Sequence, residues 1–299
     1  MRKWSIRILV FTALGFAAFW LLTRPQTLPD NAFADLIGDP SAGEQVFWAA
    51  GCASCHSAPD AKDEEDKLVL SGGQRFPSPF GTFIAPNISP SPEGIGGWST
   101  HDLGNAMLYG SSPKGQHYYP AFPYASYVRM KLRPAGLQDV ANLHAYLQTL
   151  PPSSQANAAH DVSFPFNIRR GLGLWKRIFI NDYWIVSVPL DDQQLQRGRY
   201  LIEALGHCAE CHTPRNAVGG LLYDQWLTGA PDPSGKGRVP AVNALDWSAK
   251  DIAYYLESGF TPEFDSAGGH MVNVVENMSK LTSEDREAIA AYLKSLSEK

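Results

Sequence analysis

The sequence predicts a mainly α-helical protein in which an N-terminal transmembrane helix precedes two tandem domains of one fold. Three observations lead to this prediction. An uncharged apolar run follows a basic start, a short motif of cysteine and histidine occurs twice and uses all four cysteines, and the chain around both motifs repeats at a constant spacing. With 299 residues and 44% hydrophobic side chains, the chain can form about two packed domains.

The charge balance narrows the possible partners. The chain has 25 basic and 30 acidic residues, so its formal net charge is −5. A nucleic-acid-binding protein normally carries a basic surface, and nothing in this composition provides one. We therefore expect no nucleic-acid partner.

Residues 1–26 form the predicted membrane anchor or signal. Basic residues precede an uncharged run over 8–22, and Arg24 follows it. This order of charge and apolar run directs export across a membrane. The run is on the border between a cleaved signal and a spanning helix, and snorkelling arginines extend it to about 21 residues. A possible cleavage site at 32–34 lies far past the run, so we favour a retained anchor over a cleaved signal.

The repeated motif is C-x-x-C-H, at residues 52–56 and 208–212. This is the attachment signature of c-type haem, in which each cysteine forms a thioether and the histidine binds iron on the proximal side. Two covalently attached haem c groups are therefore predicted, held by Cys52, Cys55, Cys208 and Cys211, with His56 and His212 as iron ligands. A zinc site built from both pairs, or two thioredoxin-like redox pairs, would leave the trailing histidines unexplained.

The two halves align at an offset of 149 residues. Trp98-Ser99 corresponds to Trp247-Ser248, and Asp102, Gly110 and Pro113 correspond to Asp251, Gly259 and Pro262. Serine followed three residues later by aspartate predicts a capping box at a helix start, and the glycines predict the helix ends. A short helix precedes each motif and an amphipathic helix ends each half. This order predicts two tandem class I cytochrome c domains.

The predicted domains are residues 27–153 and 191–299, joined by a connector over 154–190. The connector carries Trp175, Phe179, Tyr183 and Trp184, so it is too apolar for a free linker. We expect it to pack across both domains and to fix the distance between the haems. A short helix that covers one domain is the alternative.

A low-spin haem that carries electrons usually has a second axial ligand, which is typically methionine in c-type cytochromes. Met271 lies in a glycine-rich loop before the final helix, so we assign it to haem 2. Met278 and His270 are the alternatives.

The equivalent position in the first half is Phe122, which cannot bind iron. Met130 lies eight residues further on, and we assign it as the distal ligand of haem 1. His117 in the same loop, or an open sixth position, remain as alternatives. We interpret Met107 as a core residue. The other histidines, His101, His144, His160 and His207, are interpreted as surface or structural residues.

An acidic run over residues 60–67 follows the first motif. A solvated loop is one interpretation of it. The other is a docking patch for a basic partner near the edge of haem 1.

The chain resembles the cytochrome c subunits of bacterial membrane-bound dehydrogenases for alcohols, aldehydes and gluconate. The resemblance runs from about residue 38 to the C-terminus and is most specific at Phe164-Pro165-Phe166-Asn167-Ile168-Arg169; residues 94–99, 119–124 and 207–216 also match. It implies haem domains that face the periplasm from the bacterial inner membrane. It also implies a periplasmic dehydrogenase catalytic subunit as electron donor, and a soluble cytochrome, a terminal oxidase or a quinone as acceptor. Many members carry three haems, whereas this chain has motifs for two.

The leading hypothesis is a membrane-anchored dihaem protein that relays electrons and has no catalytic residue of its own. The alternative is a catalytic dihaem enzyme, peroxidase-like or thiosulfate-oxidising, that uses an open haem 1. A haem-based gas or redox sensor is a third hypothesis.

Overall fold

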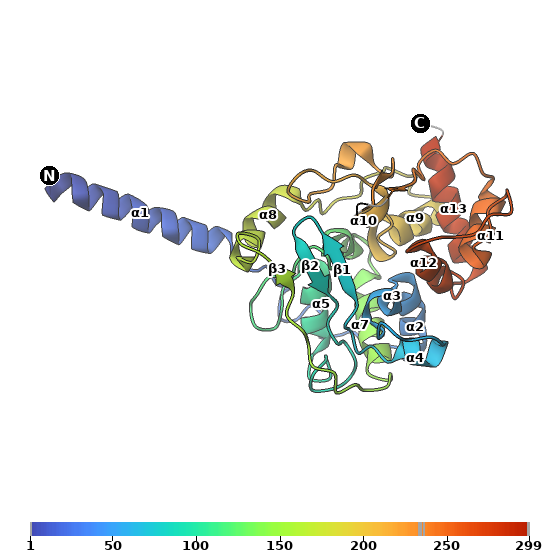
Figure 1. Ribbon diagram of the computed structural model, residues 1–299, viewed down its shortest axis with the longest axis horizontal. Coiled ribbons are helices and arrows are strands. Elements are labelled where there is room, and N and C mark those ends of the chain that lie inside the picture. The colour runs from blue at the N-terminus through green and yellow to red at the C-terminus, as the bar shows by residue number, and fades with distance from the viewer. Residues whose placement is uncertain (1, 233–234, 236, 298–299) are drawn as a thin grey trace.

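The computed structural model describes residues 2–232, 235 and 237–297. Helix α1 (Arg2–Leu22) projects from the rest of the molecule as a single rod (Figure 1). Within the described part of the chain, residues Lys3–Leu22 form the one helix long and apolar enough to cross a membrane, and none of this span is buried.

The first half folds around six helical segments. These are α2 (Pro40–Ala49), α3 (Cys52–His56), α4 (Glu64–Leu68), α5 (Thr100–Tyr109), α6 (Tyr124–Tyr127) with the 3₁₀ segment η1 (Val128–Leu132), and α7 (Gly136–Leu147). Strands β1 (Arg75–Ser78), β2 (Gly81–Ile84) and β3 (Asp161–Val162) form a small antiparallel sheet, in which Phe76 pairs with Phe83 and Thr82 with Asp161. Because β3 belongs to the connector, this sheet attaches the connector to the first domain.

The second half repeats this order. It contains α9 (Gln193–Arg199), the π-helix η3 (Tyr200–Leu205), α10 (Ala209–His212), η4 (Tyr223–Gln225), α11 (Ala249–Ser258), α12 (Met271–Met278) and α13 (Ser283–Ser297), with β4 (Ala230–Pro231) paired to β5 (Arg238–Val239). The connector carries η2 (Arg169–Gly171) and α8 (Leu172–Phe179). The short strands and α12 are additions to the mainly α-helical prediction.

Both predicted capping boxes are confirmed. The Ser99 side chain accepts from the Asp102 backbone N–H while the Asp102 side chain accepts from the Ser99 backbone N–H, and Ser248 and Asp251 do the same at α11. Gly110 and Gly259 end these helices in the left-handed region. The local sequence therefore determined both ends of the two helices.

Each domain is closed by a helix crossing that needs glycine. Helix α2 crosses α7 at Gly43, where an added Cβ would lie 2.0 Å from the Asn142 carbonyl oxygen. Helix α9 crosses α13 at Gly198, where an added Cβ would lie 1.9 Å from the Ala288 carbonyl oxygen. In both halves the final helix therefore crosses the helix that precedes the haem motif.

One buried guanidinium joins the two domains. Arg129 of η1 has no exposed surface. Its Nη1 donates to the Glu203 carbonyl oxygen of the second domain at 2.9 Å, and its Nε donates to the Tyr183 carbonyl oxygen of the connector at 3.1 Å. The guanidinium also lies over the rings of Tyr223 and Trp226. A first-domain side chain thus completes the interior of the second domain.

The connector packs across both domains, as we expected. Lys176 donates to the Tyr109 carbonyl oxygen in the first domain, at 2.6 Å. Trp175 Nε1 donates to the Val218 carbonyl oxygen in the second domain, at 2.8 Å. The alternative, a short helix that covers one domain, is wrong.

Replacing Gly43 with alanine should lower the free energy of unfolding by about 2 kcal/mol, because the new methyl group forces α2 away from α7. Gly97→Ala is the matched control, since an added Cβ there has open space. Denaturant unfolding followed by circular dichroism measures both. Equal stability of the two variants would contradict the close crossing.

Arg129→Met should lower the free energy of unfolding by about 3 kcal/mol or more, because it removes the guanidinium donor from carbonyl oxygens of the first domain, the connector and the second domain. Lys131→Met is the control, because Lys131 makes an exposed ion pair with Asp182 that contributes less than about 1 kcal/mol. The same unfolding titration tests both changes. A loss for Arg129→Met no larger than that of the control would show that the guanidinium does not hold the domains together.

Candidate haem sites

The first motif lies on the short helix α3. Gly51 precedes it with φ of 62°, a left-handed conformation that glycine adopts without strain. Cys52 and Cys55 are three residues apart on this helix, so their side chains are on one face, and both are half-buried. His56 ends the helix. The geometry thus presents two thiols and one imidazole on a single turn.

The second motif has the same arrangement on α10. Cys208 caps the helix and is half-buried, Cys211 is exposed, and His212 is buried at its end. His207, directly before this motif, has φ of 43°, a rare conformation for a residue with a side chain.

The two histidines are oriented in the same way. His56 Nδ1 lies 2.8 Å from the Pro86 carbonyl oxygen, and His212 Nδ1 lies 2.8 Å from the Pro240 carbonyl oxygen. A carbonyl oxygen only accepts, so each Nδ1 carries the proton and each Nε2 keeps a lone pair. Burial lowers the pKa of both imidazoles and thus favours the neutral form, which is the form that binds metal.

These donors fit haem c. Each site combines two thiols one turn apart with a neutral imidazole that is fixed by a backbone carbonyl, the usual support of a metal-binding histidine. Nothing in the motifs themselves indicates the two carbonyl groups. A proline 30 residues after the first histidine and 28 after the second is the signal that sequence reasoning missed.

The shared zinc site is not supported. Among the residues that the structure describes, no group of three or more His, Cys, Asp or Glu side chains is placed to hold a metal ion. The four cysteines therefore belong to two separate helices rather than to one tetrahedral cluster.

The two motifs are neighbours across the domain interface. The Ala50 carbonyl oxygen, two residues before Cys52, lies 3.2 Å from His207 Nε2 and accepts from the Tyr127 hydroxyl at 3.2 Å. Ser126 Oγ donates to Glu210 Oε1, inside the second motif, at 2.8 Å. These contacts would fix the positions of two attached haems relative to each other.

Met271, the candidate distal ligand of haem 2, is the first residue of α12 and is half-buried. It follows a glycine loop, as predicted, but it opens a helix that the sequence did not indicate. His270 is exposed beside it, and Met278 is buried in the core at the other end of α12.

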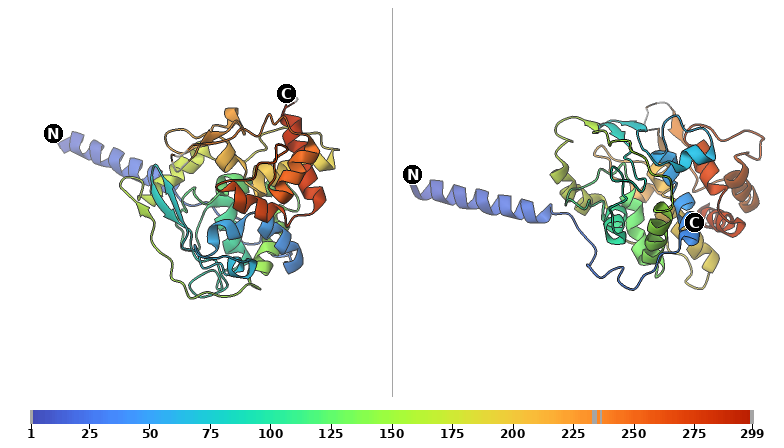
Figure 2. Two further views of the ribbon diagram at one scale, coloured as in Figure 1. Left: turned by 45° about the vertical axis from the view of Figure 1, so that its right-hand side comes forward. Right: turned by 90° about the horizontal axis from the view of Figure 1, so that it is seen from below.

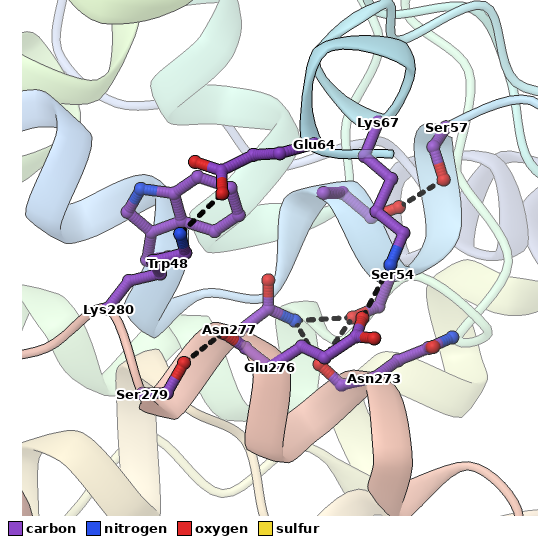
Figure 3. A pocket seen from close by; sticks show the side chains of 11 residues that line it. Trp48, Ser54, Ser57, Glu64, Lys67, Asn273, Glu276, Asn277, Ser279 and Lys280 are labelled. Atoms are coloured by element: carbon purple, nitrogen blue, oxygen red, sulfur yellow. Dashed lines mark hydrogen bonds and ion pairs between the residues drawn. The ribbon is translucent and has the colours of Figure 1, made fainter. Parts of the chain in front are cut away.

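Helix α12 packs on the first haem motif. Asn277 Nδ2 donates to Ser54 Oγ of α3 at 2.5 Å and to the Asn273 carbonyl oxygen at 2.7 Å (Figure 3). A cavity of about 310 Å³ lies here, between α2, α3 and α4 on one side and α12 on the other. The helix with the candidate ligand of haem 2 therefore contacts the attachment helix of haem 1.

The acidic run after the first motif forms helix α4 and pairs with the second domain. Lys67 Nζ lies 2.6 Å from the Glu276 carboxylate, and Glu64 pairs with Lys280 (Figure 3). Residues 62–66 are exposed, as expected of a solvated segment, but residues 64–68 form a helix rather than a loop. Two of its charges are used within the chain, at the domain interface.

Phe122 stands where the repeat would place a methionine, and it packs in an aromatic cluster. Its ring lies 5.8 to 6.4 Å from the rings of Tyr118, Tyr124 and Tyr127. Met130 is fully buried on η1, a few residues further along the chain. Its role as the distal ligand of haem 1 stays a prediction.

The alternative ligand His117 is used elsewhere. It is buried, and its Nε2 lies 2.8 Å from the Thr23 carbonyl oxygen, directly after α1. The structure therefore places His117 at the junction between the apolar helix and the first domain.

The remaining candidates have structural contacts, as predicted. Met107 is buried in α5. The other histidines bind backbone groups: His101 at Leu28, His144 at Trp98, His160 at Ile84 and His207 at Ala50.

Comparison with known proteins agrees with this geometry. A family model described as "Cytochrome c" matches residues 40–151 and 195–297. A protein named "Diheme cytochrome c-type", from Cereibacter sphaeroides, is 55% identical over 94% of this chain and 93% of its own length. The match supports two covalently attached haem c groups in this chain.

Two further relatives are parts of dehydrogenases. One of the subunits of nicotinate dehydrogenase from Pseudomonas putida is 37% identical over 95% of this chain, which spans 24% of that protein. The "Fructose dehydrogenase cytochrome subunit" of Gluconobacter japonicus is 34% identical over 86% of this chain, which spans 52% of that relative. Both relatives are therefore considerably longer than this chain.

Proposed function

The chain belongs to the cytochrome c family, and on this premise we propose that it is a membrane-anchored dihaem protein that relays electrons from a periplasmic dehydrogenase to a respiratory acceptor. The observation that carries the proposal is the contact between the two haem motifs, at Ala50 and His207, in a chain that begins with a helix able to span a membrane. The names of the longer relatives support a dehydrogenase as the electron donor.

In this proposal Cys52, Cys55, Cys208 and Cys211 form the thioethers. His56 and His212 bind iron from the proximal side, with Met130 and Met271 on the distal side. When bound, the haem iron supplies one-electron chemistry by changing between its ferric and ferrous states. With one histidine and one methionine of the chain on each iron, no position would remain for a substrate, so we assign no catalytic residue.

The chain's own residues tune and position the sites. The carbonyl oxygens of Pro86 and Pro240 hold the imidazoles in one orientation and increase their basicity as ligands. A methionine as the second ligand favours the reduced state of the iron more than a second histidine would. Arg129 and the Ala50–His207 contact keep the two attachment helices at a fixed separation.

The segment after α1 supports a retained anchor. Thr23 and Leu28 are buried against the first domain, and the Leu28 backbone N–H donates to Asn105 Oδ1 at 2.7 Å. Cleavage at residues 32–34 would remove both residues from that packing. A retained α1 in the bacterial inner membrane would place the haem domains in the periplasm.

Three classes of electron acceptor fit the proposed relay. A soluble cytochrome, a terminal oxidase or a quinone can each take single electrons from a low-spin haem. A chain with two haems gives a shorter electron path than three-haem subunits, so delivery to another cytochrome or an oxidase is as well supported as delivery to a quinone.

Phe122 favours one second candidate, a catalytic dihaem enzyme of peroxidase-like or thiosulfate-oxidising type. Its aromatic ring stands where the repeat would supply an iron ligand, and such an enzyme would use an open sixth position on haem 1. Turnover without a partner protein would distinguish this enzyme from a relay.

Carbon monoxide binding to the fully reduced protein tests the relay, with haem content measured on the same sample. We expect two haems per chain and no rapid binding, because both irons have two protein ligands. Fast binding at half of the haem would identify an open haem 1 and would favour the catalytic dihaem enzyme over the relay.

The same assay applied to variants tests the distal ligands. Met271→Ala and Met130→Ala should each open one haem to rapid carbon monoxide binding, and Met278→Ala is the buried control. A Met130→Ala variant with unchanged absorption and potential would make Met130 a packing residue. A six-coordinate Met271→Ala variant would point to His270 as the ligand.

Retention of α1 has its own test. Mass spectrometry of the holoprotein from membranes should give the full 32.8 kDa chain plus two haem groups. Release by high salt without detergent, together with a mass that lacks the first residues, would show that α1 is a cleaved signal.

A further inference from the structure

The connector exposes several large apolar side chains where α1 meets the rest of the protein. Residues of this surface, which we call the connector patch, are Phe164, Phe166, Ile168, Leu174 and Ile178. Phe164 is 76% exposed and Ile178 is 70% exposed. Five exposed apolar side chains on one short segment form a patch that water solvates poorly, so they indicate a binding surface.

The part of the connector patch on α8 lies at the end of α1 that enters the protein. Helix α8 is beside this end, on the side of the molecule from which α1 projects, and both further views agree (Figures 1 and 2). An added Cβ on Gly173 of α8 would lie 2.5 Å from the Thr23 carbonyl oxygen. The two segments are therefore in backbone contact.

Arginines of the connector bind the end of α1. Arg177 Nε donates to the Leu22 carbonyl oxygen at 2.6 Å, and Arg170 Nε donates to Thr23 Oγ1 at 2.8 Å. Arg170 also donates to the Trp20 carbonyl oxygen and lies over the Trp20 ring. The last carbonyl groups of a helix need such donors, and cations near that end are favourable. The end of α1 is therefore held by η2 and α8 of the connector.

The buried side of α8 is also attached to the first domain. Lys176 is buried and donates to the carbonyl oxygens of Tyr109 and Gly110, which end α5, at 2.6 and 2.7 Å. Because Gly173 and Lys176 face the protein, Leu174 and Ile178 are left on the outer face. Helix α8 cannot turn over to bury them without breaking these bonds.

We propose that the connector patch lies in the surface of the same bilayer that α1 crosses. This inference rests on the proposed membrane anchor. A short helix with an apolar outer face and neighbouring arginines has the composition of an interfacial helix, whose apolar face enters the boundary of headgroups and acyl chains by about 5–10 Å. Continuity with α1 selects lipid as the occupant, because the bonds from Arg170 and Arg177 hold α8 where a spanning helix would leave the membrane.

The consequence concerns the orientation of the haem domains. A chain attached by α1 alone could tilt together with that helix relative to the membrane. A chain that also rests on the connector patch presents one fixed side to the membrane, and its electron partners would then meet the haem domains from a defined direction.

Site-directed spin labelling of the full-length holoprotein in lipid nanodiscs tests this proposal. The four native cysteines are held in thioethers, so an added cysteine is the one free thiol. Phe166→Cys and Ile178→Cys place labels in the patch, with Leu174→Cys as a substitute if either variant fails to load haem. Phe264→Cys, at a site 93% exposed in the second domain, is the water control, and Phe11→Cys within α1 is the lipid control.

Collision rates of each label with oxygen, which concentrates in lipid, and with a water-soluble nickel chelate give its depth. We expect labels at 166 and 178 to favour oxygen, at a depth between those of 11 and 264. Labels at 166 and 178 that match 264, while 11 reports lipid, overturn the inference and leave the anchor intact; a patch reserved for a partner protein gives this result. A water-exposed label at 11 instead contradicts the membrane anchor itself.

Discussion

Burying the Arg129 guanidinium away from water carries a large free-energy cost, and the two domains offset it together. Its carbonyl acceptors belong to the first domain, the connector and the second domain, and the rings of Tyr223 and Trp226 lie against it. Either domain without the other would leave N–H groups of the guanidinium or their carbonyl acceptors without hydrogen bonds. The interaction that stabilises the two domains thus also sets their relative position. The distance between the two haem motifs is fixed as a result.

The two halves keep the same residue type at the helix crossings and differ in the loops that would supply the distal ligands. Gly43 and Gly198 occupy the same helix crossing, because backbone contact there excludes any side chain. In the distal loops the second domain has Met271 where the first has Phe122. Helix α12 then crosses to the first domain and binds Ser54, so the second domain supports the first motif as well as its own. The two sites are related in sequence but distinct in their distal surroundings.

The junction behind α1 gives the apolar helix a structural role in the folded protein. His117, Arg170 and Arg177 bind its last backbone carbonyl groups, and Thr23 is fully buried at the contact. Because these donors come from both the first domain and the connector, the helix is held in one direction. The apolar helix and the two haem domains are therefore linked through one connector.

The sequence by itself determined what depends on neighbours in the chain. The two C-x-x-C-H turns, the capped helices that begin at Ser99 and Ser248, and the apolar run of α1 all follow from local chemistry at fixed spacing. The tertiary structure decided what depends on distant partners, such as the carbonyl oxygens that orient His56 and His212 and the buried position of Arg129. Spacing along the chain cannot show these contacts, since each joins segments that only folding brings together.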